Sequence, residues 1–326
     1  MDELRREVGF DAYAWLITDP RTGVGCDPLA DVPCMHELHT LIKFKYLTPV
    51  NRWTTLAGLP TKVGLLRGDV ADELSVSLVW REVQSRYAVH DVASVVFSDR
   101  HGSWGFLDLW RDRGVAFDAA DGAFLASLVV PLTAALRRCQ ASTFTVTAVS
   151  HRRDLGPVVL VLDDDLAVVS QTAASKSWLE MLIPPVQGAP VIPASVYNVA
   201  AQLLALEAGV DDNEPSARVH LADGYWVTLR AARLSKAGDE PGRVAVTIEE
   251  MSPADRLDVF SRSFDLTPRE TELLAILATG IDTREVAQRV FLSEHTVQDH
   301  LKSIFAKTAT HSRRTLLARA LGTRPH

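Results

Sequence analysis

The stretch LTPRETELLAILATGIDTREVAQRVFLSEHTVQDHLKSIFAKTATHSRRTLLARAL, residues 266–321, predicts a run of short helices joined by tight turns. Its first helix begins at Thr267-Pro268, where a hydroxyl N-cap and a proline suit a helix start, and Glu270 completes a capping box. Gly280 predicts the end of that helix. Because only two residues separate the second helix from the next N-cap, Ser293, the spacing predicts a helix-turn-helix unit.

Apolar residues recur along these helices at intervals of three and four, which is typical of helices with one buried face. A last helix is expected at about 313–321. We therefore expect an all-α four-helix domain over residues 265–326, with a core formed by Leu273, Leu277, Val286, Val290, Val297, Leu301 and Ile304.

The third helix of this domain also carries a separate polar stripe. His295, Gln298, Asp299 and Lys302 follow one another at intervals that place them on one face. A helix that enters the major groove of DNA needs such polar groups in front and apolar packing behind. The pattern predicts a DNA-recognition helix, and the alternative is an ordinary protein-binding helical bundle.

The stretch closely resembles the LuxR/FixJ type of DNA-binding domain. The resemblance implies that Gln298, Asp299, Lys302 and His295 face DNA bases. It also implies that Thr296, Lys307, Arg313 and Arg314 approach the DNA backbone. The sequence departs from the family at 308–310, where the family usually has a turn with glycine. The matching residues are LTPRE (266–270), Gly280, EVA (285–287), Ser293, Thr296-Val297, His300, Lys302, Ile304, Lys307 and Ser312-Arg313.

The charge of the chain is unevenly distributed. The net charge is −7, but residues 265–326 hold nine Lys or Arg against seven Asp or Glu, which leaves +2 there and −9 elsewhere. A weakly basic DNA-binding domain on an acidic body predicts modest, salt-sensitive binding to DNA. A single copy is then expected to bind weakly, so we expect a homodimer.

The whole chain has the composition of a globular protein. It has 326 residues, of which 47% are hydrophobic and 23% charged, enough for two or three domains. Three cysteines, Cys26, Cys34 and Cys139, fit a reducing cytoplasm better than a disulfide framework. We expect a cytoplasmic protein with no membrane partner, because no stretch is expected to reach the length of a membrane span and MDELRREVGF does not resemble a signal peptide.

Residues 1–149 are expected to form an α/β sensor domain around an antiparallel sheet. AYAWLITD (12–19) predicts a strand, and DVASVVFSDRHGSWGFLDLWRDRG (91–114) predicts a hairpin with its turn at DRHG. A long helix from about Asp118 to Gln140, with Pro131 as a kink, should then cover the sheet. This order of elements is similar to the end of a GAF domain, in architecture only.

After a linker at 150–156, residues 155–251 are expected to form a second antiparallel-sheet α/β sensor domain. PVVLVLDDDLAVVSQT (157–172) predicts two strands around an acidic turn, and 194–208 predicts a helix. Two further strands at 217–235, with Asp223-Gly224 at their turn, and a last strand at 242–251 complete a PAS-like order. The alternative is a phosphoacceptor receiver, whose first strand would be followed by a helix.

The segment at 252–264 predicts a linker helix with one apolar face, formed by Leu257, Phe260 and Phe264. Two such helices could pair across the two-fold axis of a dimer that reads palindromic half-sites. Packing of the same face against the PAS-like sheet of its own chain is an equal alternative.

Two weaker patterns lie in the first 140 residues. Cys34, His36 and His39 have the spacing of metal ligands but no fourth ligand, so we expect no metal. Trp15, Trp104 and Trp110 are candidates for lining an apolar ligand pocket, although core packing explains most tryptophans. We find no catalytic or cofactor-binding motif and expect neither catalysis nor a cofactor.

Together these patterns predict an α+β chain with two sensor domains and a DNA-binding domain. We expect a LuxR-type bacterial transcription regulator that binds double-stranded DNA as a homodimer under control of a small-molecule ligand, with RNA polymerase as a further possible partner. The alternative is a sensor that acts mainly through protein partners and binds DNA weakly.

Overall fold

The computed structural model describes residues 1–145, 158–175, 179, 192–221, 225–235 and 241–323. The chain divides into two compact units, which are treated separately below. The first comprises residues 1–134, 154–219 and 228–249, and the second comprises residues 135–153, 220–227 and 250–326.

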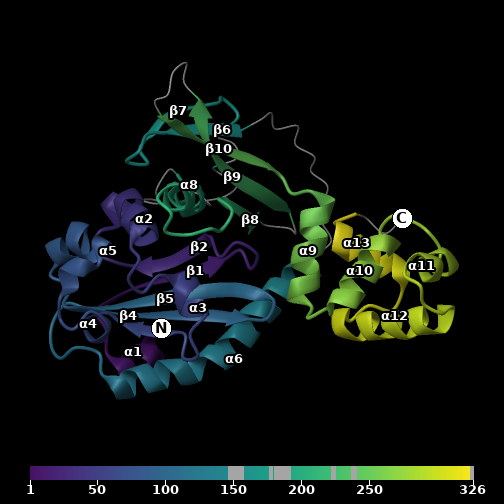
Figure 1. Ribbon diagram of the computed structural model, residues 1–326, viewed down its shortest axis with the longest axis horizontal. Helices are drawn as coiled ribbons and strands as arrows, with labels where there is room; N and C mark the ends of the chain where they lie inside the picture. The colour runs from purple at the N-terminus through teal and green to yellow at the C-terminus, as the bar shows by residue number, and fades with distance from the viewer. Residues whose placement is uncertain (146–157, 176–178, 180–191, 222–224, 236–240, 324–326) are drawn as a thin grey trace. The chain divides into compact units, whose positions relative to one another are not determined.

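The first unit contains a five-stranded sheet with strand order β2-β1-β5-β4-β3 (Figure 1). All of its strand pairs are antiparallel, as predicted. The predicted hairpin is present, with Asp99 paired to Gly102 at its turn. The strands are β1 (Ala12–Thr18), β2 (Gly25–Asp31), β3 (Val63–Leu65), β4 (Asp91–Asp99) and β5 (Gly102–Arg111).

The sequence did not predict β2 or β3, the two edge strands of this sheet. β2 contains Asp27, Pro28 and Asp31 and lacks the apolar alternation that indicates a strand. Proline cannot donate a ladder hydrogen bond, but an edge strand has one side where none is needed. β3 is only three residues long, so its sequence carries no period.

Short helices cover this sheet. The longest element is α6, which begins and ends close to the predicted helix and contains Pro131. Our expectation that no stretch reaches the length of a membrane span was wrong. By length and composition alone, α6 is long and apolar enough to cross a membrane. The helices are α1 (Asp2–Val8), α2 (Leu38–Leu47), α3 (Trp53–Ala57), α4 (Leu66–Asp69), α5 (Leu78–Glu82) and α6 (Ala119–Thr143), with 3₁₀ turns at Met35–Glu37, Leu74–Val76 and Gln84–Tyr87.

A second five-stranded sheet has the order β7-β6-β10-β9-β8, the same arrangement as the first. β6 is followed directly by antiparallel β7, with Leu162 opposite Val168, so a receiver-type helix does not follow the first strand. The predicted linker 150–156 and the turn at Asp223-Gly224 lie outside the described residues. The elements are β6 (Val158–Leu162), β7 (Val168–Gln171), α8 (Ala194–Glu207), β8 (Ser216–His220), β9 (Trp226–Ser235) and β10 (Pro241–Glu250).

Helix α8 connects the two predicted sensor regions within the first unit. It packs against α2 and β2 of the first sheet, and ten of its residues are buried. A helix that is apolar on nearly all sides needs neighbours all around it. Most of the two regions expected to form separate domains, namely residues 1–134, 154–219 and 228–249, therefore lies in one compact unit.

Two buried ion pairs join the same regions. Arg52 Nε lies 2.7 Å from Asp211 Oδ2, and Arg218 Nη1 lies 3.0 Å from Asp19 Oδ2. All four side chains are at most 3% exposed, so these charges are paired away from water. Each pair takes one partner from each predicted region.

The C-terminal helices begin where the sequence predicts. Hydroxyl or carboxylate side chains at Ser252, Thr267, Asp282, Ser293 and Ser312 each accept a hydrogen bond from the N–H three residues later. Thr267 and Glu270 form the full capping box. The helices are α9 (Pro253–Ser263), α10 (Pro268–Leu277), α11 (Thr283–Arg289), α12 (Glu294–Thr308) and α13 (Arg313–Leu321).

Candidate nucleic-acid interface and ligand cavity

One hydrophobic core holds the C-terminal helices together. It contains all seven residues assigned to the core from the sequence, each at most 5% exposed. It also contains Phe144 and Trp226, from segments outside 265–326, and Leu257 and Phe260 of α9. The compact unit is therefore larger than the domain that the sequence predicts.

This core leaves one side of α12 in solvent. The side chains of His295, Asp299 and Lys302 are 86%, 54% and 72% exposed, and Gln298 is also exposed. On the opposite side, Val297 and Ile304 are fully buried. α12 thus has the two faces that a recognition helix needs.

The exposed stripe is internally paired. Lys302 Nζ donates to Asp299 Oδ1 at 3.0 Å, and His295 Nε2 lies 3.5 Å from Asp299 Oδ2. The hydrogen bond from Lys302 lowers the pKa of Asp299, so this carboxylate stays charged. Asp299 therefore offsets the positive charge of Lys302 on this exposed face.

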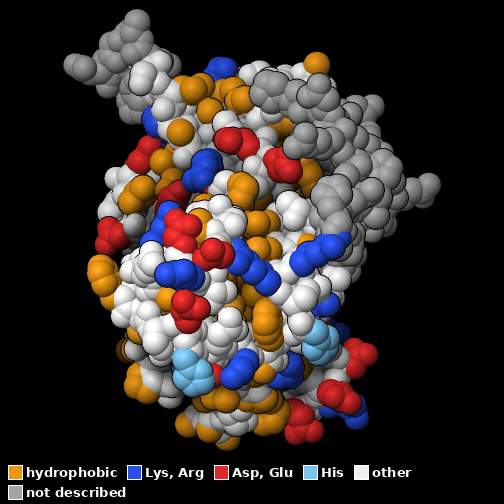
Figure 2. All heavy atoms as spheres, turned by 90° about the vertical axis from the view of Figure 1, so that its right-hand side faces the viewer, with side chains coloured by type: hydrophobic (Ala, Val, Ile, Leu, Met, Phe, Trp, Pro, Cys, Tyr) orange, Lys and Arg blue, Asp and Glu red, His pale blue; other side chains and the backbone are white. Residues whose placement is uncertain are grey.

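Figure 2 shows one face of the molecule with its side chains coloured by type. Lys and Arg side chains are interspersed there with Asp and Glu, and the positive charge does not merge into one large patch. This agrees with the small positive charge of residues 265–326. A surface with this charge distribution offers a nucleic acid a few phosphate contacts rather than a broad basic field.

Of the residues expected at the DNA backbone, two lie at the surface and two make hydrogen bonds to other parts of the domain. Thr296 lies at the start of α12, with its hydroxyl 2.9 Å from that of Ser293, and Arg314 is exposed. Lys307 instead donates to Glu270 at 2.6 Å and to the carbonyl of Asp265 at 3.0 Å.

Arg313 is also engaged within the domain, because its guanidinium donates to the carbonyls of Leu277 and Ile281. Lys307 and Arg313 thus join helices of the domain in this structure. The resemblance alone did not indicate these contacts.

Glu270 is a buried carboxylate that contacts both α10 and α12. It is 3% exposed and accepts hydrogen bonds from Lys307 Nζ, Ser303 Oγ and the N–H of Thr267, at 2.6, 2.6 and 2.7 Å. Burial raises the pKa of this carboxyl, but the three hydrogen bonds and the Lys307 charge outweigh burial and lower the pKa to about 2. Glu270 therefore ties the start of α10 to the recognition helix.

The turn after α12 explains the departure from the family pattern at 308–310. Ala309 has φ 48° and ψ 45°, a left-handed conformation that ends the helix. Glycine adopts this conformation without the steric cost that a Cβ brings. The chain keeps the turn with an alanine in the place where glycine is usual.

The apolar face of the linker helix is covered by its own chain. Leu257 and Phe260 are 8% and 0% exposed, and Phe264 is partly buried. Phe144 packs edge-on against Phe260 and stacks on Trp226, with ring centroids 5.4 and 5.2 Å apart. Packing within the chain is therefore the alternative that the structure favours over pairing of α9 across a dimer axis.

A cavity in the first unit is the second candidate site. Its walls are mostly apolar, and its volume is about 40 Å³, about three times what one buried water needs. Lys45 crosses it to Asp108, with Nζ and Oδ2 2.7 Å apart, and Ser94 donates to the same carboxylate at 2.6 Å. The lining comprises Ala14, Leu16, Pro28, Ala30, Val32, Leu38, Leu41, Ile42, Lys45, Tyr46, Trp53, Gln84, Phe106, Asp108, Trp110, Ala194 and Asn198.

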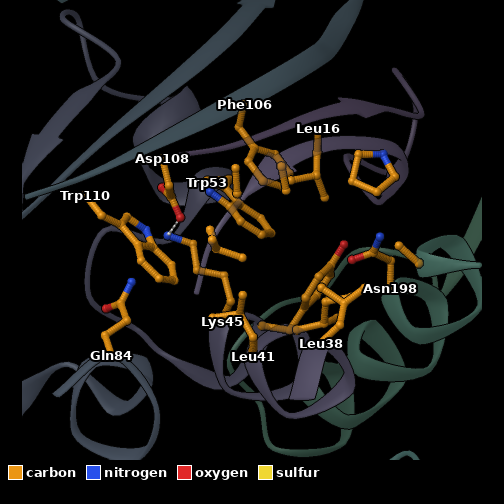
Figure 3. A pocket seen from close by; sticks show the side chains of 17 residues that line it. Leu16, Leu38, Leu41, Lys45, Trp53, Gln84, Phe106, Asp108, Trp110 and Asn198 are labelled. Atoms are coloured by element: carbon orange, nitrogen blue, oxygen red, sulfur yellow. Dashed lines mark ion pairs between the residues drawn. The ribbon is translucent and has the colours of Figure 1, made fainter. Parts of the chain in front are cut away.

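Polar groups without partners face this cavity. Both side-chain atoms of Asn198, on α8, are buried and have no hydrogen-bond partner among the described residues, and the same holds for Gln84 Oε1 and Trp110 Nε1. Figure 3 shows Gln84 and Asp108 at one end, Asn198 at the other, and apolar side chains between them. Unpaired buried polar groups cost stability, so a cavity that keeps them suits a ligand with matching groups.

The three tryptophans that are candidates for lining a pocket differ in their position relative to this cavity. Trp110 lines the cavity, and so does Trp53, which was not predicted. Trp15 stacks on Phe97 at 5.5 Å, and the indole N–H of Trp104 donates to Asp99 at 2.9 Å. Neither lines the cavity. Trp15 alternates on β1 with Ala14 and Leu16, which do line it, so Trp15 points to the other face of the sheet.

The possible metal ligands have different neighbours. Cys34 is fully buried, His36 Nε2 lies 3.2 Å from the Tyr87 hydroxyl, and His39 packs near Tyr197. His36 lies in a 3₁₀ turn and His39 in α2, so the two do not share one helix face. Within the described ranges, no three His, Cys, Asp or Glu side chains cluster as metal ligands would.

Comparison with known proteins covers mainly the C-terminal helices. Residues 265–320 match the family described as "Bacterial regulatory proteins, luxR family". Over 49 residues the chain is 41% identical to transcriptional regulatory protein LnrK of Bacillus subtilis (strain 168), which is 15% of this chain and 22% of LnrK. Over 95 residues it is 40% identical to probable HTH-type transcriptional regulator GfsR of Streptomyces halstedii, which is 29% of this chain and 34% of GfsR. The matches thus span well under half the length of either relative.

A solved structure of Escherichia coli SdiA covers 98% of this chain and 89% of SdiA, with 12% identity and a TM-score of 0.34. A VqmA–ligand–DNA complex from Vibrio cholerae aligns over 54% of this chain and 88% of the VqmA chain, with 15% identity and a TM-score of 0.22. Scores this low do not establish a shared fold. The match at 265–320, together with the capped helices and two-faced α12, shows that the chain carries a C-terminal helix-turn-helix domain of the luxR family of bacterial regulatory proteins.

Proposed function

We propose that this protein is a cytoplasmic transcription regulator that binds specific DNA sequences through α12. The observation that carries the proposal is the exposed polar stripe His295, Gln298, Asp299 and Lys302 on a helix whose other face is fully buried. In a luxR-family domain this face meets base edges in the major groove. Asn- and Gln-type amides pair with adenine, lysine pairs with guanine, and Asp accepts from cytosine.

Replacing Lys302 by Ala is expected to weaken DNA binding and reduce its salt dependence. Lys302 is 72% exposed, so its ammonium can reach a phosphate or a guanine without rearrangement of the core. Losing one phosphate contact lowers the slope of log affinity against log salt by about 0.9 per bound protomer. Selection from a random duplex library, followed by binding measurements at several salt concentrations, gives both the site and the slope.

The matched control is Arg113→Ala. It removes the same charge from a side chain that is 89% exposed and lies outside the C-terminal unit. Its slope should equal that of wild type. If the full-length wild-type protein enriches no sequence and shows no salt-dependent binding, the DNA-reading proposal fails and a regulator acting through protein partners is the better description.

We further propose that the first unit senses a small molecule in the cavity between the first sheet and helices α2 and α8. The two sheets, with their shared strand order, would be GAF-like and PAS-like modules that have merged across α8. Support comes from the unpaired Asn198 amide and Gln84 carbonyl in an apolar cavity. The bound molecule would be small, largely apolar and uncharged, since Lys45 and Asp108 already neutralise each other.

If the Asn198 amide is held ready for a ligand, Asn198→Leu should stabilise the ligand-free protein by about 1–2 kcal/mol, because it removes unpaired buried polar atoms. Asn213→Leu is the matched control, since Asn213 Nδ2 donates to Asp211 at 2.7 Å and its loss should destabilise. Urea unfolding of both variants provides the comparison. A loss of stability in Asn198→Leu similar to that in Asn213→Leu would mean that Asn198 is structural.

A further inference from the structure

Phe291 places an aromatic ring in solvent at the turn between α11 and α12. The residue is 94% exposed, the highest exposed fraction of any large hydrophobic residue in the described part of the chain. Its neighbours behave differently, because Val290 is buried and Leu292 packs against the core of the C-terminal helices. A ring this exposed contributes almost nothing to that core.

The backbone at Phe291 has the conformation that glycine usually provides at the end of a helix. The N–H of Leu292 donates to the carbonyl of Ala287 at 3.0 Å, and the N–H of Phe291 donates to that of Gln288 at 3.3 Å. These two bonds form a Schellman motif, with Phe291 as its left-handed residue at φ 55°. The chain does use glycine in the left-handed position that ends α13, Gly322.

These two features together set Phe291 apart from other exposed apolar residues. A single apolar side chain on a surface is common and needs no explanation. A left-handed backbone adds a steric cost for any residue with a Cβ. Glycine could form both backbone hydrogen bonds of the turn without that cost and without a ring in water. A strained, exposed aromatic residue of this kind indicates a function outside the fold itself.

The position of Phe291 favours DNA as the molecule that the ring contacts. Ser293, the N-cap of α12, comes only two residues after Phe291, and base-facing His295 comes four residues after it. A recognition helix enters the major groove with its N-terminal residues at the base edges, so the turn before the helix lies at the same end. Phenylalanine can contact the methyl group of thymine there.

The neighbours of Phe291 suit DNA better than an apolar protein surface. The exposed residues nearest in sequence are polar or charged: Gln288, Arg289, Ser293 and Glu294. The core of a protein–protein interface is apolar, whereas DNA presents isolated methyl groups and sugar carbons among polar atoms. A single ring among polar side chains matches the second pattern.

The small charge of the domain makes such a contact more important. Residues 265–326 carry a charge of only +2, and Asp299 pairs with Lys302 on the exposed face of α12. Few phosphate contacts release few counterions, so contacts that do not depend on salt supply more of the affinity.

We propose that Phe291 is a further DNA-contacting residue, whose ring packs against apolar groups of the duplex beside the N-terminal end of α12. These groups are a thymine methyl or the carbons of a deoxyribose, which the experiments below distinguish. The inference rests on the proposed DNA-binding function. It adds a salt-independent contact to the polar stripe of α12.

The first test replaces Phe291 by Gly in the full chain. Affinity for a fluorescent duplex that carries the selected site should fall about tenfold per bound protomer, because partial burial of the ring is lost. The slope of log affinity against log salt should stay at the wild-type value, in contrast to Lys302→Ala, because no phosphate contact is removed. The midpoint of urea unfolding should be equal to or above that of wild type, since glycine relieves the left-handed strain.

Two further variants separate the ring from the backbone. Ala309→Gly makes the same backbone change at a second exposed left-handed residue, φ 48°, at the other end of α12, about 22 Å along its axis. It should leave the affinity for DNA unchanged. Phe291→Tyr keeps the ring and should keep the affinity of wild type.

Replacing thymidine by deoxyuridine, one position at a time, identifies the group that the ring contacts. If it is a thymine methyl, wild type should lose affinity at one position, and Phe291→Gly should lose nothing more there. If it is a deoxyribose, no single replacement should reproduce the effect of Phe291→Gly.

Three outcomes would overturn the inference. If wild type binds its site and Phe291→Gly binds it equally well, the ring makes no contact with DNA, while the proposed function stands. If Phe291→Gly loses affinity together with a lower urea midpoint, the ring has a structural role. If wild type binds no duplex at any salt concentration, this inference and the proposed function both fail.

Discussion

Replacing Arg52 by Leu is expected to lower the free energy of unfolding of the first unit by about 3–5 kcal/mol. Arg52 and Asp211 form a buried pair with side chains 3% and 2% exposed, and Nε lies 2.7 Å from Oδ2. The guanidinium also donates to Gln202 Oε1 at 3.2 Å and to the carbonyl of Tyr46. Removing it leaves a carboxylate without its counter-charge away from water, which costs more than the pair contributes.

The size of this effect should depend on burial and not on the residue type. Arg86→Leu makes the same change at a side chain that is 52% exposed and lies 2.8 Å from Glu37, where an ion pair contributes about 0–1 kcal/mol. Urea unfolding followed by tryptophan fluorescence measures both, since Trp53 follows Arg52 directly. An equal, small loss in the two variants would contradict the prediction.

A double variant separates loss of the pair from loss of packing. Asp211→Leu should also destabilise strongly, because Thr54 and Asn213 lose an acceptor along with Arg52. Arg52→Leu with Asp211→Leu should cost less than the two single changes together, since no charge is then left unpaired. Strict additivity would show that the two side chains act independently.

The C-terminal helices could be predicted closely because their signals are local. Each begins one residue after a capping side chain, and α13 has the expected bounds, Arg313–Leu321. The two faces of α12 likewise follow from residue spacing along a single helix. What could not be predicted is that Phe144 and Trp226 complete the core of these helices, since they are distant in sequence and no local pattern assigns them there.

The cavity was only partly predictable for the same reason. Its polar groups come from α2, the 3₁₀ turn at Gln84–Tyr87, β5 and α8, so the site exists only once α8 packs on the first sheet. One signal was available: Asp108 lies between Leu107 and Leu109 in a strand whose neighbours are almost all buried. A carboxylate there needs a partner, but the sequence does not show that the partner is Lys45.

The separate sensor domains were expected from strand and helix order, which the two regions do have. Their packing into one compact unit depends on contacts that no local sequence pattern indicates. One example is the ion pair between Arg218 and Asp19, which are 199 positions apart. Small apolar residues on every side of α8 were the available clue, because such a helix must be surrounded.

Glu270→Gln is expected to destabilise the C-terminal domain by about 3 kcal/mol at pH 7. The pKa of Glu270 in the folded state is about 2, against an ordinary value of 4.5, and each unit corresponds to about 1.4 kcal/mol. The folded pKa is the lower one, so the stabilisation is fully present above pH 4.5. It should be lost as pH falls from there towards 2.

The difference between wild type and Glu270→Gln isolates this carboxyl from others that titrate in the same range. That difference should be about 3 kcal/mol at pH 7 and much smaller at pH 3, as measured by urea unfolding at each pH. Glu272→Gln is the matched control two residues along α10: its side chain is 50% exposed and paired with Arg269, so its effect should stay within about 0.5 kcal/mol at both pH values. A pH-independent loss in Glu270→Gln would show that the amide fails for steric reasons. The charge-assisted bonds from Lys307 and Ser303 would then not be what holds α10 to the recognition helix.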